Sequence, residues 1–240
     1  MKVFFLSFRR RKVILFVLVV LVILLLVWLF LRSGDAGAVL NPTKNTAIYQ
    51  GEESKQNIAL ECNVVWGTEY IEPMLDVLKE KNIHITFFIG GEWAKSNPDL
   101  MNRFAKEGHE IGNHGYSHQH HNNLNLDGNR KEILDTEKVI EAETGIKTTL
   151  FAPPYGEFND TTLQAADSLG YRTIMWSIDT IDWKRDGKEK ILQRVMKNPH
   201  NGALILMHPT ADTVAVLPVI IEKLQGLGYH IGTVSDAIQG

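Results

Sequence analysis

Residues 58–89, IALECNVVWGTEYIEPMLDVLKEKNIHITFFI, contain the pattern that decides the fold. The run 58–65 is short and apolar, and 83–89 is rich in β-branched and aromatic residues, so both are predicted strands. Between them, residues 70–81 place their apolar side chains at helical spacing on one face. A strand, a helix and a second strand in this order are typical of a parallel sheet.

The same alternation continues to the C-terminus. Further strands are predicted at 110–112, 148–152, 171–177, 203–207 and 229–233. Further helices are predicted at 98–107, 130–143, 160–169, 188–197 and 213–225. About seven strands with helices between them indicate a parallel sheet, either closed as a barrel or open and covered on both faces.

Length and composition exclude several classes of protein. A chain of 240 residues holds one domain or two. The single cysteine, Cys62, excludes an internal disulfide framework and a cysteine-based zinc site. No phosphate-loop or dinucleotide-binding glycine motif is present, which argues against a nucleotide as partner.

Charge is distributed unevenly along the chain. Residues 1–32 hold six of the 25 Lys and Arg residues and no acid, which leaves 19 bases against 28 acids in the rest. A net charge of −9 on that larger part is a poor match for polyanions. Nucleic acid is therefore not expected as a partner.

The N-terminal region is predicted to be a membrane anchor. Residues 13–31 are all apolar and span about 28 Å as a helix, enough to cross a bilayer. The basic tail 1–12 keeps the N-terminus cytoplasmic, so the remainder is expected outside the membrane. A cleaved signal peptide is the alternative, with Ala36-Gly37-Ala38 as a cleavage site. Residues 32–54 are predicted to be a linker, and 55–240 the globular domain.

Unusual polar residues follow the predicted strands. They are Asn63 after the first strand, His114 and His118 after the third, Pro153-Pro154-Tyr155-Gly156 after the fourth, Asp179 and Asp182-Trp183 after the fifth, and His208 after the sixth. In both architectures the carboxyl ends of parallel strands meet at one rim, where the chemistry of such folds takes place. A functional site is predicted there.

The residue types at this rim indicate metal and acid–base chemistry. His114 and His118 are four residues apart, a spacing that suits one divalent metal on a helical turn. Their neighbours His120 and His121 fit a polar surface loop. A carboxylate such as Asp182 beside His208 would favour the protonated imidazole that a general acid requires.

Four stretches together resemble the polysaccharide deacetylase family, the NodB-homology domain of carbohydrate esterase family 4. They are His114-Gly115-Tyr116-Ser117-His118, Phe151-Ala152-Pro153-Pro154-Tyr155-Gly156, Asp179-Thr180-Ile181-Asp182-Trp183 and Leu206-Met207-His208. With the anchor, residues 65–70 are similar to the sporulation-associated branch of that family. The resemblance implies a deformed (β/α) barrel of seven or eight strands.

The resemblance also implies an activity, the removal of N-acetyl groups from amino sugars of a cell-wall glycan. A divalent metal, usually zinc, would be held by His114, His118 and an aspartate, and would activate a water. His208 would protonate the leaving amine, and Asp182 would tune it, with Asp179 in support. The remaining implied roles are substrate contacts by Pro153, Pro154, Trp183 and Leu206, and an oxyanion-directed backbone N–H from Tyr155.

Three positions depart from the family pattern. Asn63 stands at the position of the general base, Val64 at that of the third metal ligand, and Ala152 at that of an arginine which pairs with the base. Losing a general base costs about 10²–10⁴-fold in rate. The changes at 63 and 152 are linked, because an arginine without its aspartate would be an uncompensated charge. Glu61, two residues before Asn63 on the same strand face, is a candidate substitute base.

Two hypotheses follow. The first is a membrane-anchored deacetylase of cell-wall glycan that is weak or altered in mechanism. The second is a non-catalytic descendant that binds glycan or a protein partner through the same surface. Intact His114, His118, Asp182 and His208 favour the first, whereas Asn63, Val64 and Ala152 favour the second.

Overall fold

The computed structural model describes residues 20–21 and 46–238. The second range contains a sheet of eight strands in which every ladder is parallel. The strands are β1 (Asn57–Val64), β2 (Thr86–Ile89), β3 (Glu110–Asn113), β4 (Leu150–Phe151), β5 (Arg172–Thr173), β6 (Ile178–Asp179), β7 (Leu204–Met207) and β8 (His230–Gly232). Their order in space is β5-β4-β3-β2-β1-β7-β6, and β8 pairs with the beginning of β1.

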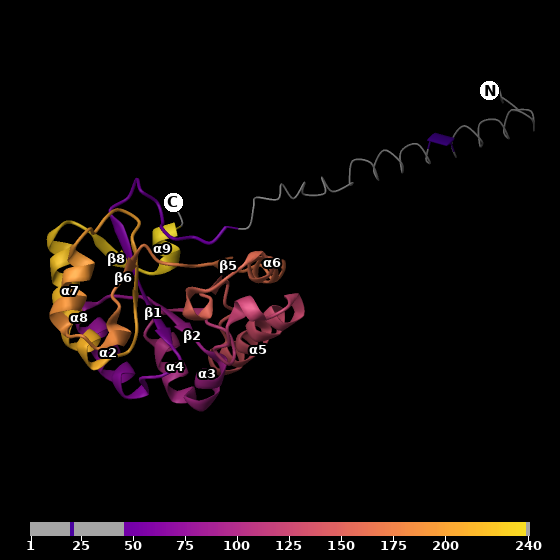
Figure 1. The fold of residues 1–240 in the computed structure, drawn as a ribbon, viewed down its shortest axis with the longest axis horizontal. Coiled ribbons are helices and arrows are strands. Elements are labelled where there is room, and N and C mark those ends of the chain that lie inside the picture. Colours follow the sequence, from indigo (N-terminus) through magenta and orange to yellow (C-terminus); the bar gives the residue numbers. More distant parts are fainter. Residues whose placement is uncertain (1–19, 22–45, 239–240) are drawn as a thin grey trace, which may run out of the picture. The chain divides into compact units, whose positions relative to one another are not determined.

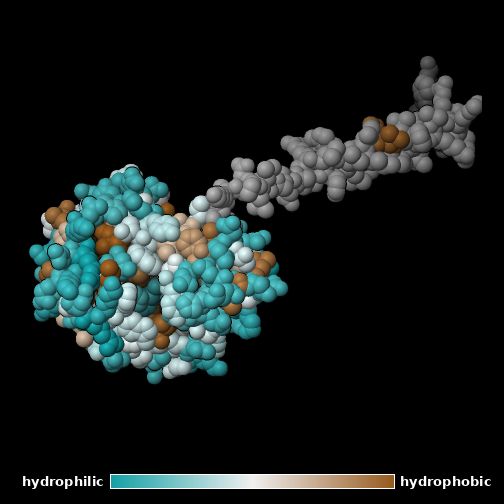
Figure 2. All heavy atoms as spheres, viewed as in Figure 1, coloured by the Kyte–Doolittle hydropathy of each residue, from teal (hydrophilic) through white to brown (hydrophobic). Residues whose placement is uncertain are grey.

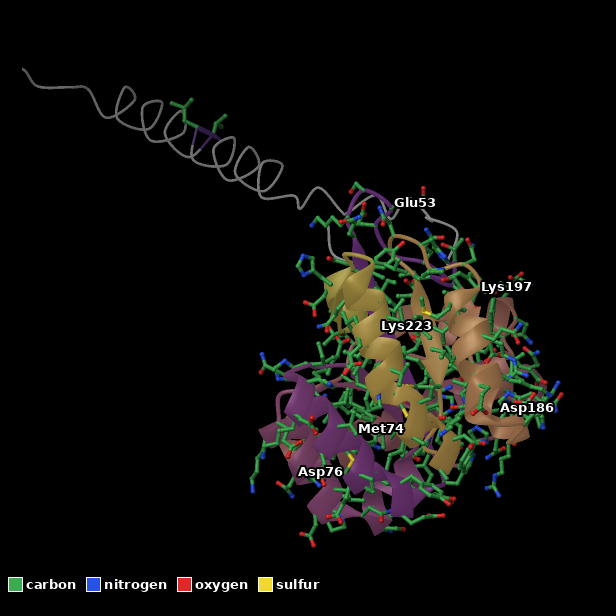
Figure 3. The ribbon with its side chains drawn as sticks, turned by 90° about the vertical axis from the view of Figure 1, so that its left-hand side faces the viewer. Glu53, Met74, Asp76, Asp186, Lys197 and Lys223 are labelled. Atoms are coloured by element: carbon green, nitrogen blue, oxygen red, sulfur yellow. The ribbon has the colours of Figure 1, made fainter. Side chains whose placement is uncertain are left out.

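Helices connect the strands and cover the outside of the sheet (Figure 1). They are α2 (Thr68–Lys81), α3 (Gly91–Ser96), α4 (Pro98–Lys106), α5 (Leu126–Thr144), α6 (Asp160–Ser168), α7 (Lys188–Met196), α8 (Ala211–Gly226) and α9 (Val234–Ile238). The domain's outer surface is mostly hydrophilic in the view of Figure 2, with apolar residues scattered singly. On α2, Met74 lies buried among the packed elements while Asp76 is at the periphery (Figure 3), as the amphipathic pattern predicts.

The two faces of the sheet have different surroundings. In β1, Leu60, Cys62 and Val64 belong to the large apolar core between the sheet and the helices. Ala59 belongs to a smaller core inside the curved sheet. Because side chains alternate along a strand, Glu61 and Asn63 share the inward face with Ala59. The inward face therefore carries polar groups toward the carboxyl end of β1.

The parallel sheet with alternating helices predicted from the sequence is confirmed, with one correction to the strands. Of the predicted strand 171–177 only Arg172–Thr173 is a strand, β5, which lies beside β4 at one edge of the sheet, while the next strand, β6, lies beside β7 at the opposite edge (Figure 1). Residues 174–177 cross from one edge to the other. Within residues 46–238 no ladder joins β5 to β6, so the sheet is a half-barrel and not a closed one.

The residues before β1 occupy part of that opening. Ile48 bridges Ile174 in parallel, and Gln50 bridges Ala203 in antiparallel orientation. The predicted linker 32–54 therefore includes residues, Ile48 and Gln50, that pair with the domain. The expected anchor, 13–31, lies outside the described residues except for 20–21, which are helical. Among the described residues, no helix has both the length and the apolar character needed to cross a bilayer.

Candidate functional site

The carboxyl ends of the strands form a rim at which the predicted residues meet. His114 directly follows β3, and its backbone N–H donates to the carbonyl of Ile89 at 3.0 Å. Ala152 directly follows β4 and donates its N–H to Asn113 at 2.9 Å. Cys62 pairs with Met207 across β1 and β7, so the next pair in that register is Asn63 and His208. The ladders therefore place Asn63 level with His208, and His114 level with Ala152 two residues further toward the rim.

His114 is a neutral imidazole of fixed orientation. Its side chain is buried, and its Nδ1 lies 2.7 Å from the carbonyl oxygen of Ala152. A carbonyl only accepts, so Nδ1 carries the proton and Nε2 keeps its lone pair. Burial, followed by the charge of His118, lowers the pKa of His114 to about 3. The ring is thus held ready to accept a hydrogen bond or bind a metal through Nε2.

His118 lies beside His114, with 5.2 Å between the ring centroids. The predicted helical turn between them is wrong: residues 114–118 form an irregular loop, and His118 has a left-handed backbone with φ of 53°. Glu132 of α5 holds this loop by accepting from the backbone N–H groups of Tyr116 and Ser117, each at 2.8 Å. Burial also lowers the pKa of His118. The loop brings the two imidazoles together without a helix.

The position of a third metal ligand is not filled. Val64 is buried in the outer apolar core, so its side chain faces away from the rim. Within residues 20–21 and 46–238, no group of three or more His, Cys, Asp or Glu side chains is arranged to hold a metal ion. Two neutral imidazoles alone do not fit the three-ligand zinc site that the family resemblance implies.

The position of the general base is filled by an amide. Asn63 is 6% exposed, and its Oδ1 is buried without a hydrogen-bond partner. Ala152, at the arginine position, is buried in the inner apolar core, so this position supplies no cation to Asn63. An uncharged amide cannot take a proton from water as a carboxylate does.

Glu61, the candidate substitute base, lies in surroundings that disfavour its charged form. Its side chain is buried on the inward face of the sheet, two residues before Asn63 along β1, and its Oε2 has no hydrogen-bond partner. Burial, followed by the charge of Glu110, raises the pKa of Glu61 well above its usual value. Burial thus favours the neutral carboxyl, whereas a general base must be ionised to take a proton from water.

The opposite side of the rim is intact. Asp182 is fully buried, and its Oδ1 lies 2.8 Å from Nδ1 of His208. Its Oδ2 accepts from the backbone N–H of His208 and from the hydroxyl of Thr213, both at 2.6 Å. His208 is thereby fixed at two points. Thr213 was not predicted from the sequence, because a threonine in the first turn of a helix normally serves as a capping residue.

Trp66 completes this side and was also not predicted as a site residue. Its ring is stacked on the imidazole of His208, with 5.6 Å between centroids and an interplanar angle of 8°. Gly67 follows with φ of 73°, and a Cβ there would lie 2.2 Å from the carbonyl oxygen of Pro209. Close packing of the chain after β1 against the chain after β7 therefore fixes Trp66. An aromatic residue just beyond the end of β1 was the only available signal.

Aromatic residues extend the rim outward. Tyr155 is 55% exposed, has a left-handed backbone with φ of 60°, and contacts His118 with 4.4 Å between rings. His120 stacks on the ring of Tyr155, with 4.1 Å between the centroids, and its Nδ1 lies 2.9 Å from a carboxylate oxygen of Glu157. His120 therefore belongs to the surface. Trp183, which follows Asp182, is 52% exposed. Both exposed rings follow strand ends, as the sequence predicted.

The remaining predicted residues lie below or beside these groups. Leu206, on the inward-facing register of β7 opposite Glu61, is buried, as are Pro153 and Pro154. Asp179 of β6 accepts from the backbone N–H of Ile181 at 2.8 Å, and burial raises its pKa. His121 is buried and bonded to Asn129, in a supporting position and not in a surface loop as expected.

A comparison with protein families agrees with this geometry. Residues 50–174 match the family model described as polysaccharide deacetylase. The chain belongs to the polysaccharide deacetylase family. The motif resemblance noted in the sequence is thereby confirmed.

Individual relatives include a protein named as a deacetylase and one described as a pseudoenzyme. The uncharacterized protein YlxY of Bacillus subtilis is 39% identical over 79% of this chain, which spans 59% of that relative. A peptidoglycan-N-acetylglucosamine deacetylase of Bacillus cereus is 34% identical, with 80% of this chain and 71% of that one covered. The structure of BA3943 from Bacillus anthracis, described as a CE4 family pseudoenzyme, is 40% identical with a TM-score of 0.79, covering 80% of this chain and 69% of that one. A mutant of BA3943, described as having restored enzymatic activity, has the same TM-score at 38% identity, covering 80% of this chain and 71% of that one.

Proposed function

We propose that this protein binds N-acetylated amino-sugar units of a cell-wall glycan at the rim without hydrolysing them at a measurable rate. The observation that carries the proposal is the amide of Asn63 at the base position, combined with an outward-facing Val64 at the ligand position. Proton abstraction and metal binding are both weakened there, while the rest of the rim is retained.

Binding is supported by the groups that remain. Tyr155 and Trp183 present exposed rings, and such aromatic surfaces with a few fixed polar groups are typical of ligand sites. His208 keeps a ring nitrogen beyond its bond to Asp182 for contact with a hydroxyl or an amide. Relatives named as peptidoglycan deacetylases support peptidoglycan as the class of glycan.

Slow deacetylation is the second candidate. The observation in its favour is the ordered pair of Asp182 and His208, which has the geometry of a general acid. Without a third ligand or a base among the described rim residues, no step through a metal is assigned to this chain.

We further propose that the protein acts outside the membrane while tethered to it. The apolar run 13–31 and the four basic residues before it support an uncleaved anchor with a cytoplasmic N-terminus. This location would place the domain next to the wall glycan. A protease-protection assay on intact cells tests it, since only an external domain is digested without lysis.

The test of function uses the full-length chain in detergent micelles. Co-sedimentation with purified peptidoglycan measures binding, and acetate release with added zinc or cobalt measures hydrolysis. We expect binding that falls in a Tyr155→Ala variant, and acetate release near the blank. Release that disappears in a His114→Ala variant would instead establish the slow deacetylase, and folded protein without binding or release would refute both candidates.

A further inference from the structure

The amide oxygen of Asn63 is a buried acceptor without a donor. An unpaired buried polar atom destabilises a fold, and a leucine of similar shape would avoid that cost. The residue lies on the inward face at the carboxyl end of β1, in register with His208. On the other side, Asn63 pairs with Phe88 and Phe88 with Gly112, two residues before His114. The acceptor therefore lies between the two sides of the rim.

The charge at this point discriminates between two forms of an amino sugar. A free amino sugar presents an ammonium group, which needs a carboxylate nearby. The oxygens of Asp182 are occupied by His208 and Thr213, and Asp179 accepts from the backbone N–H of Ile181. Burial raises the pKa of Glu61, which favours its neutral form. An acetamido group instead presents a neutral N–H and a carbonyl oxygen. These two groups complement a side-chain amide, which carries one acceptor and two donors.

We propose that Asn63 is a specificity-determining residue that selects N-acetylated over free amino sugars by accepting the acetamido N–H at Oδ1. The inference rests on the proposed binding function and adds the basis of recognition. The substitution that removes a base supplies a neutral acceptor at the same place. The protein would then recognise acetylated glycan and release the deacetylated form.

Isothermal titration of the full-length chain in detergent tests this inference. The ligands are β-1,4-linked tetramers of N-acetylglucosamine and of glucosamine, titrated with EDTA present so that no metal contributes. We expect the wild-type chain to bind the acetylated tetramer at least 10-fold more tightly. Asn63→Leu should lose about 10-fold in affinity for it, the loss of one hydrogen bond to a buried site, and keep its affinity for the free amine.

Two further variants separate recognition from folding. Asn63→Asp should reverse the preference, since a carboxylate attracts the ammonium form, and this reversal remains measurable even if Asn63→Leu fails to fold. Asn102→Leu, which removes an amide from helix α4, is the matched control and should leave both affinities unchanged.

The possible outcomes distinguish this inference from the proposed function. Equal affinity of the wild-type chain for both tetramers, or a preference that survives in Asn63→Leu, would overturn the role of Asn63 while glycan binding stands. Failure of the folded wild-type chain to bind either tetramer or peptidoglycan would refute the proposed function itself.

Discussion

The two sides of the rim differ in how completely their polar atoms are satisfied. The acid side consists of Asp182, His208 and Thr213. There Asp182 is fully buried, and both of its oxygens are hydrogen-bonded by His208 and Thr213. The β1 side consists of Glu61 and Asn63 of β1 together with Ala152. There Asn63 and Glu61 each keep a buried side-chain oxygen without a hydrogen-bond partner, and Ala152 has no polar side-chain atom to donate to them. A satisfied network stabilises the fold by itself, whereas unpaired atoms leave the site open to a ligand. The acid side therefore contributes to the stability of the fold, and the β1 side is where this chain departs from the family pattern.

The largest expected effect comes from rebuilding the β1 side. The triple variant Asn63→Asp, Val64→Asp, Ala152→Arg replaces the three departures from the family pattern. Acetate release from N-acetylglucosamine oligomers with zinc should rise by about 10²-fold or more, the usual contribution of a general base. Adding His208→Ala to this variant should abolish the gain.

This experiment also tests the comparison between the two sides. A folded triple variant that binds zinc but releases acetate no faster than wild type would show that the acid side, although ordered, is not competent. The double variant Asn63→Asp, Ala152→Arg measures the contribution of the base without that of the metal ligand. It also leaves position 64 apolar, which suits a side chain that faces the outer core.

The acid side should be the more costly to disrupt. Asp182→Ala leaves the donors of His208 and Thr213 without an acceptor, and we expect it to lower the free energy of unfolding by about 3 kcal/mol. Asp179→Ala is the matched control, because this partly buried carboxylate accepts from the backbone of Ile181, and should cost about 1 kcal/mol. Urea unfolding followed by circular dichroism measures both, and equal losses would contradict the contrast.

The β1 side should respond to pH instead. Burial raises the pKa of Glu61 above the value of 4.5 expected in the unfolded chain. Below pH 4.5 both states hold the proton; as the pH rises toward the folded pKa, only the unfolded state releases it, so wild-type stability falls. Glu61→Gln cannot titrate, so its stability relative to wild type should increase between pH 5 and 8, by at most about 1.4 kcal/mol per pH unit.

Unfolding curves at four pH values across that range provide the measurement. Glu53→Gln, at an exposed position before β1 (Figure 3), is the control and should show a constant difference from wild type. A constant difference for Glu61→Gln as well would mean that the carboxyl is ionised in the folded protein, which would reopen its role as a substitute base.

These contrasts also show what the sequence was able to predict. The positions of His114 and His208 followed from strand ends, because parallel strands must meet at one edge. The loop shape between His114 and His118 did not, since Glu132, fourteen residues beyond His118, holds it in place. The early end of the strand predicted at 171–177 was not visible in the sequence either, because composition does not show that the chain crosses between two sheet edges after Thr173. Local pattern predicted the ends of elements, and long-range hydrogen bonds decided the geometry between them.

The smallest effect concerns Trp66, which covers the acid side without bonding to it. Its ring stacks on His208 and is only partly buried, and His208 is already held at two points by Asp182. Stacked aromatic pairs contribute about 0.5–1.5 kcal/mol beyond their buried area, so Trp66→Leu should lower the free energy of unfolding by about 1 kcal/mol. Trp183→Leu, at an exposed rim position, is the matched control and should change it by no more than about 0.5 kcal/mol.

A double-mutant cycle with His208→Ala isolates the stacking of Trp66. If the ring stabilises the imidazole, the two changes together should cost less than their sum, because either one already removes the contact. Full additivity would mean that Trp66 packs only against the chain around Gly67 and Pro209. In that case Asp182 alone would hold His208 in place, and the ring of Trp66 would be available to contact the glycan.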